Sequence, residues 1–575
     1  MMTASSMIIR QTQARSDVEI HLPDGRVYLG PRGTAVGVFL KAIPDLNEIP
    51  IMGAIVNGEL RELTYPIEMD SRVQSLSMSD ADGARIYRRS LIFLLEAAFE
   101  DLYPDALLAV DHSVASGGFF CQVAGRQQLT REELAALENH MREIVAADLP
   151  FQRFQMPLEE AIEYFKQKGQ LVKVRLLRYR KKKHLMMYQL GTHRDYHHGY
   201  MVASSGDIQW FSLNFMDDGF VIRYPRRHRP TELLPLPDST QLLATFRQYG
   251  SWLEKLGISS VGALNDAIST NRIGEVILVA EALQTQQIAE IAAEIVEQRE
   301  EKKIILIAGP SSSGKTTFSK RLAIQLLAHG ISPYPVEMDN YFVDREKTPL
   351  DETGQYDYES IGALDRVSLS KHLNALIRGE EVQLPRYNFR TGKSEPGDVI
   401  RLEKDQLIIL EGIHGLNPQL LQDIPEQHTF RIYVSCLTQL NLDSQNRIST
   451  TDTRLIRRIV RDSRERGYTA QQTIKQWESV RRGEKRNIFP YQDNANKMFN
   501  SALVYELSAL RPLAEPLLRQ VPFGTREHIE AKRLLALLEW FLPVDTLYVP
   551  DNSILKEFVG GSLLKDFKIW TNSPA

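Results

Sequence analysis

The residues best suited to chemistry lie in one glycine- and serine-rich stretch, 304–317, which reads IILIAGPSSSGKTT. An apolar, β-forming run leads into Gly309-x-x-x-x-Gly314-Lys315-Thr316, and a helix-forming segment, 318–327, follows. Glycines let backbone N–H groups turn inward, and the helix adds its positive end, so a polyphosphate is the natural ligand. Strand, loop and helix together predict a P-loop that binds a nucleoside triphosphate, rather than a plain turn.

Each residue type in this loop has a predicted task. Lys315 reaches the outer phosphates, the Thr316 hydroxyl ligates Mg²⁺, and Thr317 contacts an inner phosphate. The other predicted ATP-binding positions are Gly309, Ser311, Ser312, Ser313 and Gly314.

Two acidic residues follow strand-like runs downstream of the loop. Asp339 comes directly after the short run 335–338, and Glu411 ends the apolar run 407–410. Because ligands collect at the carboxyl ends of strands in α/β sheets, both carboxylates should face the loop. We expect Asp339 to act as general base on an attacking hydroxyl, with a turn or cap aspartate as the alternative, and Glu411 to hold Mg²⁺ through water.

An arginine-rich segment, 453–482, is predicted to form a helix-loop-helix. Such a charge run is often only a solvated helix face. Arginines beside a P-loop can also neutralise a phosphate in transfer, so we expect this segment to be a mobile lid.

Residues 303–518 resemble the uridine kinase and phosphoribulokinase family in the stretches GPSSSGKTT, MDNYF, QYDYE, LPRYNF, LIILEGI and RLIRRIVRDSRERG. The resemblance implies ATP- and Mg²⁺-dependent transfer of a phosphoryl group to the 5′-hydroxyl of a nucleoside, with a pyrimidine nucleoside such as uridine or cytidine favoured. It implies that Asp339 is the catalytic base and that Arg461 and Arg466 join Lys315 in contacting phosphate. The nucleoside-contacting positions that it implies are Asp357, Tyr387, Phe389, Arg458 and Gln476.

The sequence departs from that family beside the base pocket. Uridine kinases carry a histidine a few residues after the tyrosine and phenylalanine, where this chain has RTGK at 390–393. The identity of the base is therefore left open.

Residues 17–82 are predicted to form a small mixed domain. Val18, Ile20 and Leu22 alternate as in a strand, and Asn57-Gly58 separates two strand-like runs as in a tight hairpin. With LPDGRVY and VNGEL, the segment resembles the TGS domain, the ubiquitin-like β-grasp module of threonyl-tRNA synthetases and some GTPases.

The next stretch, 83–235, resembles the second domain of threonyl-tRNA synthetase in YRRSLIFLLEAAFEDLYPDA, GGFFCQV and YQLGTHRDYHHGYMVASSGDIQWFSL. The metal-competent editing positions of that family fall on Arg89, Phe93, His197 and Met201. Only His197 among them could bind a metal, and a catalytic zinc needs about three protein ligands. We therefore expect a degenerate editing site.

The predicted fold class is α/β: a P-loop kinase with a mostly parallel sheet, preceded by a β-grasp (TGS-like) domain and an α+β synthetase-like domain. Its five parts are a β-grasp domain (1–82), the synthetase-like domain (83–235), a helical connector (236–302), a uridine-kinase-like domain (303–545) and a C-terminal tail (546–575) that is expected to pack on the kinase domain without chemistry of its own.

Composition narrows the class of protein. The 575 residues are 43% hydrophobic with a formal net charge of −4, which predicts a globular chain and argues against nucleic acid as its main partner. Two basic runs, 173–184 and 223–229, are interpreted as a solvated hairpin tip and a charged hinge. Two distant cysteines, and no apolar run of about 18 residues, favour a cytoplasmic protein without a membrane partner.

A small-molecule nucleoside is the expected partner, and homo-oligomerisation is left open. One alternative function is a kinase of another small hydroxylated metabolite. Another is a nucleotide-switched RNA-binding or translation-associated protein, although Asn496-Lys497 lacks the following residues of a guanine-reading motif.

Overall fold

The computed structural model describes residues 13, 15–46, 48–114, 117–216, 218–235, 240–350, 354, 356–388, 390–403 and 405–567. Phe389, predicted to contact the nucleoside, lies outside them. The chain divides into two compact units, one formed by Met1–Pro157, His184–Leu236 and Phe523–Ile529, the other by Leu158–Lys183, Pro237–Pro522 and Glu530–Ala575. The five domain boundaries given above remain predictions.

The first unit begins with a β-grasp sheet of order β2-β1-β5-β3-β4. Its elements are β1 (Asp17–His21), β2 (Val27–Pro31), α1 (Val36–Lys41), β3 (Ile51–Val56), β4 (Glu59–Arg61) and β5 (Ser71–Ser77). β1 and β5 pair in parallel at the centre, and the other pairs are antiparallel. The β3–β4 hairpin turns at Asn57 and Gly58, both with positive φ, as the sequence predicts.

An α+β region follows in the same unit. It consists of α2 (Ala81–Leu102), β6 (Leu107–Ser113), β7 (Gly118–Ala124), α3 (Arg131–Ala146), β8 (Gln152–Pro157), β9 (His184–Leu190), β10 (His193–Asp195), β11 (Ser212–Met216) and β12 (Gly219–Arg223). The strands form two antiparallel sheets, β11-β12-β7-β6 and β10-β9-β8.

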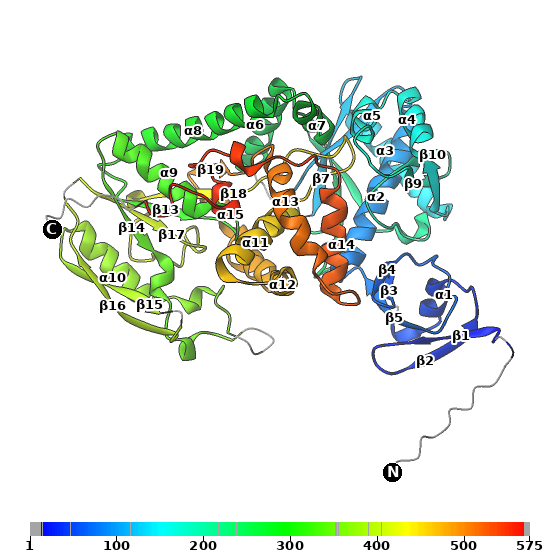
Figure 1. Ribbon diagram of the computed structural model, residues 1–575, viewed down its shortest axis with the longest axis horizontal. Helices are drawn as coiled ribbons and strands as arrows, with labels where there is room; N and C mark the ends of the chain where they lie inside the picture. Colours follow the sequence, from blue (N-terminus) through cyan, green and yellow to red (C-terminus); the bar gives the residue numbers. More distant parts are fainter. Residues whose placement is uncertain are drawn as a thin grey trace, which may run out of the picture. The chain divides into compact units, whose positions relative to one another are not determined.

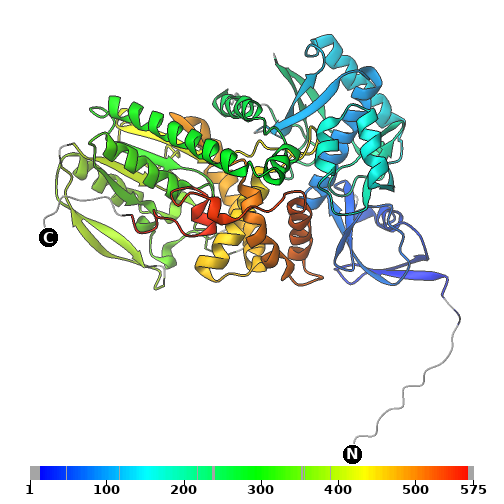
Figure 2. The same ribbon diagram turned by 45° about the horizontal axis from the view of Figure 1, so that its top comes forward.

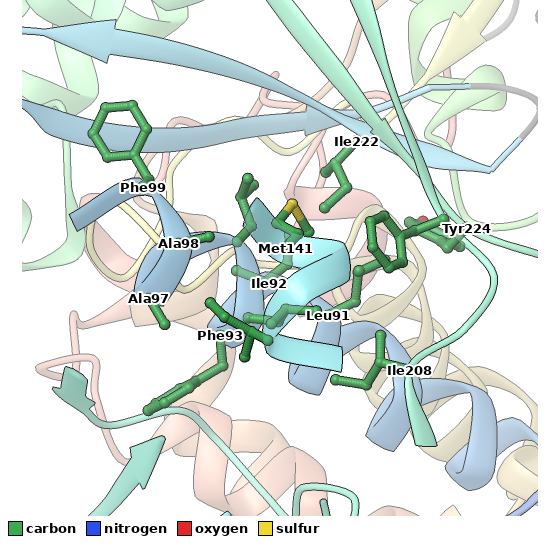
Figure 3. Packing of buried hydrophobic residues seen from close by; sticks show 14 of the residues in the cluster. Leu91, Ile92, Phe93, Ala97, Ala98, Phe99, Met141, Ile208, Ile222 and Tyr224 are labelled. Carbon is green, nitrogen blue, oxygen red and sulfur yellow. The ribbon is translucent and has the colours of Figure 1, made fainter. Parts of the chain in front are cut away.

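Helix α2 supplies much of the core of this region. Its buried apolar side chains, including Leu91 and Phe93, pack with Met141 of α3 and Ile222 of β12 (Figure 3). Because α2 is buried around most of its circumference over 90–99, any polar residue there is enclosed by protein.

The second unit opens with helices. They are α4 (Leu158–Gln167), α5 (Leu171–Leu177), α6 (Thr240–Leu256), α7 (Val261–Ser269) and α8 (Ile273–Glu297). Residues 173–184 were expected to form a solvated hairpin tip, and that expectation is wrong for their first half. This half lies in α5, where Lys173 is 1% exposed and its ammonium group lies 5.3 Å from the ring centre of Phe165.

The sheet of the second unit has the order β14-β17-β13-β18-β19, with every neighbouring pair parallel. The strands are β13 (Ile304–Ala308), β14 (Pro333–Glu337), β17 (Leu407–Glu411), β18 (Thr429–Ser435) and β19 (Lys497–Asn500). β13 is buried along its whole length, and β18 is buried except at the half-buried Arg431, as near-continuous apolar runs in parallel sheets usually are. The mostly parallel α/β sheet predicted from the sequence is confirmed.

Helices and one hairpin lie between and after these strands along the chain. The helices are α9 (Lys315–Ala328), α10 (Arg366–Ile377), α11 (Thr450–Arg466), α12 (Ala470–Asn487), α13 (Glu506–Arg519), α14 (Arg526–Leu538) and the single turn α15 (Lys556–Val559). The hairpin of β15 (Val382–Asn388) and β16 (Lys393–Ile400) extends beside α10 (Figures 1 and 2). No helix within the described residues is long and apolar enough to cross a bilayer.

Candidate active site

The loop between β13 and α9 has the geometry of a phosphate-binding P-loop. A side chain at Gly309 would place its Cβ 2.0 Å from the carbonyl oxygen of Val434, so only glycine fits there. Ser312 and Gly314 have φ of 58° and 84°, and α9 starts at Lys315, three residues before the expected helix start. The loop backbone and the N-terminus of α9 are therefore arranged as an anion site.

The arginine-rich helices hold this loop in place. Glu484 of α12 accepts a hydrogen bond from the backbone N–H of Ser311 at 3.0 Å and pairs with Arg454 of α11. Arg454 donates to the Ser311 carbonyl at 2.8 Å, and Arg457 donates to that of Ser312 at 3.4 Å. These arginines are almost fully buried, so this part of α11 is a support for the loop rather than a solvated face.

Arg458 belongs to the same support. Its guanidinium group donates to the Ser311 hydroxyl at 2.9 Å and to Asp462 at 3.1 Å. The structure thus places this predicted nucleoside-contacting residue at the P-loop.

The two arginines of the predicted lid that were expected to contact phosphate share Asp462 as an acidic partner with Arg458. Arg461 and Arg466 lie 2.9 and 3.4 Å from Asp462, which is buried. The Arg466 side chain is 51% exposed, so it retains freedom to contact a phosphate group.

Two predicted site carboxylates, those of Glu411 and Asp339, lie at the edge of the sheet where the parallel strands end. Glu411 ends β17 and pairs in register with Ile307 of β13 and with Glu337 of β14. Asp339 follows Glu337 by two residues, in a 3₁₀ turn. Parallel pairing therefore brings the loop after β13 and both carboxylates to one edge, as predicted.

Glu411 and Thr316 form the oxygen-rich corner of the site. The Thr316 hydroxyl donates to Glu411 Oε1 at 3.1 Å. Burial, opposed by the charge of Lys315, raises the pKa of Glu411 to about 7. Hydroxyl and carboxylate oxygens are the donors that Mg²⁺ prefers, so the two residues fit the magnesium role predicted for them.

Asp339 is exposed to solvent, but nearby protein atoms partly desolvate its carboxyl group. This partial desolvation raises the pKa of the carboxyl group above the ordinary value, and the positive charges of Lys315 and Arg466 oppose the shift. The carboxylate and both cations are therefore within electrostatic range of one another.

The remaining predicted nucleoside positions are dispersed. Tyr387 packs edge-on against Phe342, with ring centres 5.6 Å apart, and its backbone N–H donates to Asn340 beside Asp339 at 3.3 Å. Asp357 accepts the backbone N–H of Glu359 at 3.1 Å. Gln476 is exposed on α12.

Sequence reasoning missed three acidic residues around the loop. Glu484 supports Ser311, and Glu557 of the C-terminal tail accepts hydrogen bonds from Thr317. Burial, together with the charge of Glu484, raises the pKa of Glu359 to about 7. Glu359 ends the QYDYE stretch, to which only Asp357 was assigned a role. Glu484 and Glu557 stand in no recognisable motif, because they reach the site only through packing.

Comparison with known proteins agrees with this geometry. Residues 304–507 match the model of the "Phosphoribulokinase / Uridine kinase family". This region is a P-loop kinase domain of that family. The phosphate-binding loop, the carboxylates at the sheet edge and the arginines beside the loop are the groups that a phosphotransferase needs, and the family match agrees with that class of enzyme.

A second region matches threonine–tRNA ligases. It is 31% identical to the enzyme of Desulforamulus reducens over 160 residues, and 31% identical to that of Polaromonas naphthalenivorans over 199 residues. These matches cover 28% and 34% of this chain. The chain spans only 25% and 31% of the length of the two ligases.

Solved kinases also align with the chain. A "Possible Uridine Kinase" from Bacillus stearothermophilus is 19% identical, with 37% of this chain and 98% of that chain covered and a TM-score of 0.26. D-glycerate 3-kinase from Cryptococcus neoformans is 14% identical, with 36% and 89% covered and a TM-score of 0.26.

Proposed function

We propose that this chain is an ATP- and Mg²⁺-dependent nucleoside kinase, which transfers the γ-phosphoryl group to the 5′-hydroxyl of a nucleoside. Pyrimidine nucleosides such as uridine and cytidine are the first candidates. The observation that carries the proposal is the position of Asp339, at the sheet edge that holds the P-loop and within electrostatic range of Lys315.

The proposed chemistry consists mainly of positioning and charge neutralisation. Asp339 accepts the proton of the attacking hydroxyl, and its raised pKa makes it a stronger base than an ordinary aspartate. Lys315, Arg461 and Arg466 neutralise the phosphoryl oxygens. Bound Mg²⁺ neutralises phosphate charge, with Thr316 and Glu411 as the residues that would hold it.

Two features support a nucleoside as acceptor. Phe342 directly follows the turn that carries Asp339 and packs edge-on against the buried ring of Tyr387, and a nucleobase can contact the half-buried Phe342 ring. Asp357 offers a carboxylate to sugar hydroxyls, on the same loop as Glu359, which interacts electrostatically with Lys315. The family match agrees with this choice, although that family also includes kinases of phosphorylated sugars.

The test is a panel of nucleosides and small sugars assayed with MgATP and the full-length chain, with Asp339→Asn alongside. We expect 5′-monophosphate from at least one pyrimidine nucleoside. Asp339→Asn should lower kcat by roughly 10²–10⁴-fold and leave MgATP binding intact, because general-base catalysis contributes about that much.

The panel separates the alternatives. If a sugar but no nucleoside is phosphorylated, the chain is a kinase, but the proposed nucleoside acceptor is wrong. If Asp339→Asn retains full turnover, Asp339 is not the general base.

Binding of tRNA is a second candidate function, because a second region of the chain is similar to threonine–tRNA ligases. Its test is a filter-binding titration with total tRNA at low and high salt, with and without MgATP. Salt-sensitive binding that responds to MgATP, without phosphorylation of any acceptor, would favour this candidate.

A further inference from the structure

A buried group of metal-ligating side chains lies in the first unit, separate from the kinase domain. Glu96 projects from α2, and His193 and Asp195 lie two residues apart in β10, so their side chains share one face of the strand. All three residues are at most 5% exposed. One ligand atom from each lies within 4.8 Å of the others.

His193 is oriented as histidine ligands usually are. Its Nδ1 lies 2.6 Å from the Glu100 carboxylate, while its buried Nε2 has no hydrogen-bond partner and lies 3.6 Å from Glu96 Oε2. In metal sites a ligating imidazole donates its second N–H to a carboxylate, which fixes the ring and leaves the other nitrogen for the ion. Glu100 occupies that outer position.

Neighbouring residues fix the rest of the group. The ring of Phe93 meets the His193 ring edge-on, with centres 4.9 Å apart, and it meets the His197 ring in the same way. His197 Nε2 lies 3.0 Å from Glu96 Oε2, and Asp195 accepts the backbone N–H of Tyr196 at 2.6 Å. Both carboxylates thus make a further polar contact, and the Glu96 oxygen that faces His193 is the one that contacts His197.

We propose that Glu96, His193 and Asp195 bind a divalent transition-metal ion, with Zn²⁺ as the best match and Glu100 as the positioning residue for the imidazole. Zn²⁺ takes nitrogen and carboxylate oxygen ligands together, and a dication offsets the cost of burying two carboxylates. None of these three residues occupies an editing position assigned by the synthetase resemblance, at Arg89, Phe93, His197 and Met201.

A proton on His193 is the competing occupant. Burial lowers the pKa of His193, but its hydrogen bond to Glu100 and the nearby Glu96 carboxylate outweigh this effect and raise the pKa to about 9. A buried ion pair without metal would satisfy the same carboxylates, so the test must count metal ions.

The test uses the full-length chain, treated with a chelator and then dialysed against Zn²⁺ without nucleotide. Elemental analysis should find about one more Zn²⁺ per chain in the wild type than in His193→Gln and Asp195→Asn. Co²⁺ in place of Zn²⁺ should give visible absorption that both variants lose. Glu100→Gln should weaken binding by roughly 10–100-fold, the usual effect of losing an outer-shell partner.

His140 offers a matched control. It also lies between two carboxylates, 3.0 Å from Asp101 and 3.1 Å from Glu143, but at the surface. His140→Gln should bind Zn²⁺ like the wild type.

Equal zinc content in the wild type and His193→Gln overturns the proposal in favour of the metal-free ion pair. If the buried substitutions unfold the chain, as far-UV circular dichroism would show, Glu100→Gln decides instead. An unchanged Zn²⁺ affinity of that variant overturns the proposal equally.

Discussion

The Glu557 carboxylate accepts two hydrogen bonds from Thr317, one from its backbone N–H at 3.3 Å and one from its hydroxyl at 2.9 Å. Thr317 lies in the first turn of α9, where a P-loop presents its donors to phosphate. Glu557 belongs to α15, which packs beside α11 (Figure 1). Arg464 holds this turn by donating to the Glu557 carbonyl at 2.9 Å. A carboxylate of the tail therefore occupies donors that we expect a nucleotide phosphate to use.

Glu557→Gln is expected to tighten MgATP binding. The substitution keeps the shape of the side chain but removes a negative charge from an anion site. We expect the Kd to fall roughly tenfold, which is about 1.4 kcal/mol. A fluorescence titration with an ATP analogue, without acceptor, measures it independently of turnover.

Asp551→Asn is the control for Glu557→Gln. It removes the same charge from the same tail segment, at a residue that pairs with Lys556 at 3.3 Å. Its Kd should equal that of the wild type. Equal Kd values for Glu557→Gln and the wild type would contradict competition at Thr317.

The pH dependence of catalysis should reflect the crowded carboxylates. Partial desolvation by nearby protein raises the pKa of Asp339, and a general base acts only when it is deprotonated. The value of kcat/KM should therefore rise with pH, with its acidic limb above that of an ordinary aspartate. For Glu411, burial raises the pKa to about 7, Lys315 opposes the shift, and Glu557 adds to it.

Glu557→Gln should consequently lower the pKa of Glu411 and move the acidic limb to lower pH. Profiles of kcat/KM for MgATP between about pH 5 and 9 report these groups in the free enzyme. Superimposable profiles of the two proteins would show that Glu411 does not control the limb.

Thr316→Val should impair the use of Mg²⁺. Valine keeps the shape of threonine but removes the hydroxyl that donates to Glu411. We expect the Mg²⁺ concentration for half-maximal activity to rise at least roughly tenfold, in line with losses at other metal sites. Ser319→Ala, one turn along α9, removes a hydroxyl without this contact and should leave the Mg²⁺ requirement unchanged.

Arg457→Met should destabilise the kinase domain. Arg457 is fully buried, lies 2.5 Å from Glu506 and donates to the carbonyl of Ser501 at 2.9 Å. Removing one partner leaves Glu506 buried without its cation, at a cost of about 3–5 kcal/mol. Urea denaturation followed by circular dichroism measures the loss.

Arg466→Ala provides the contrast to Arg457→Met. Its side chain is half exposed, so its pair with Asp462 contributes at most about 1 kcal/mol to stability. This variant should lose turnover and keep its denaturation midpoint. If Arg466→Ala instead lowers the denaturation midpoint and Arg457→Met does not, Arg466 is the stabilising arginine and the prediction is wrong.

Local sequence was sufficient where function depends on neighbouring residues. The loop from Gly309 to Thr317 is specified by its own glycines and by the strand and helix on either side. The Asn57-Gly58 hairpin is likewise encoded by two residues that accept positive φ. Asp339 and Glu411 could be assigned to one edge because parallel strands align their carboxyl ends.

Tertiary structure decided everything that depends on distant segments. Only the docking of the C-terminal tail brings Glu557 to Thr317, 240 residues away. Packing of α11 turned Arg458 towards Ser311, while Arg457 became a buried support. The sequence by itself determined the kind of ligand that the loop accepts, because phosphate recognition uses local backbone donors. The charges around that ligand were decided by the fold, since electrostatic partners need closeness in space and not in sequence.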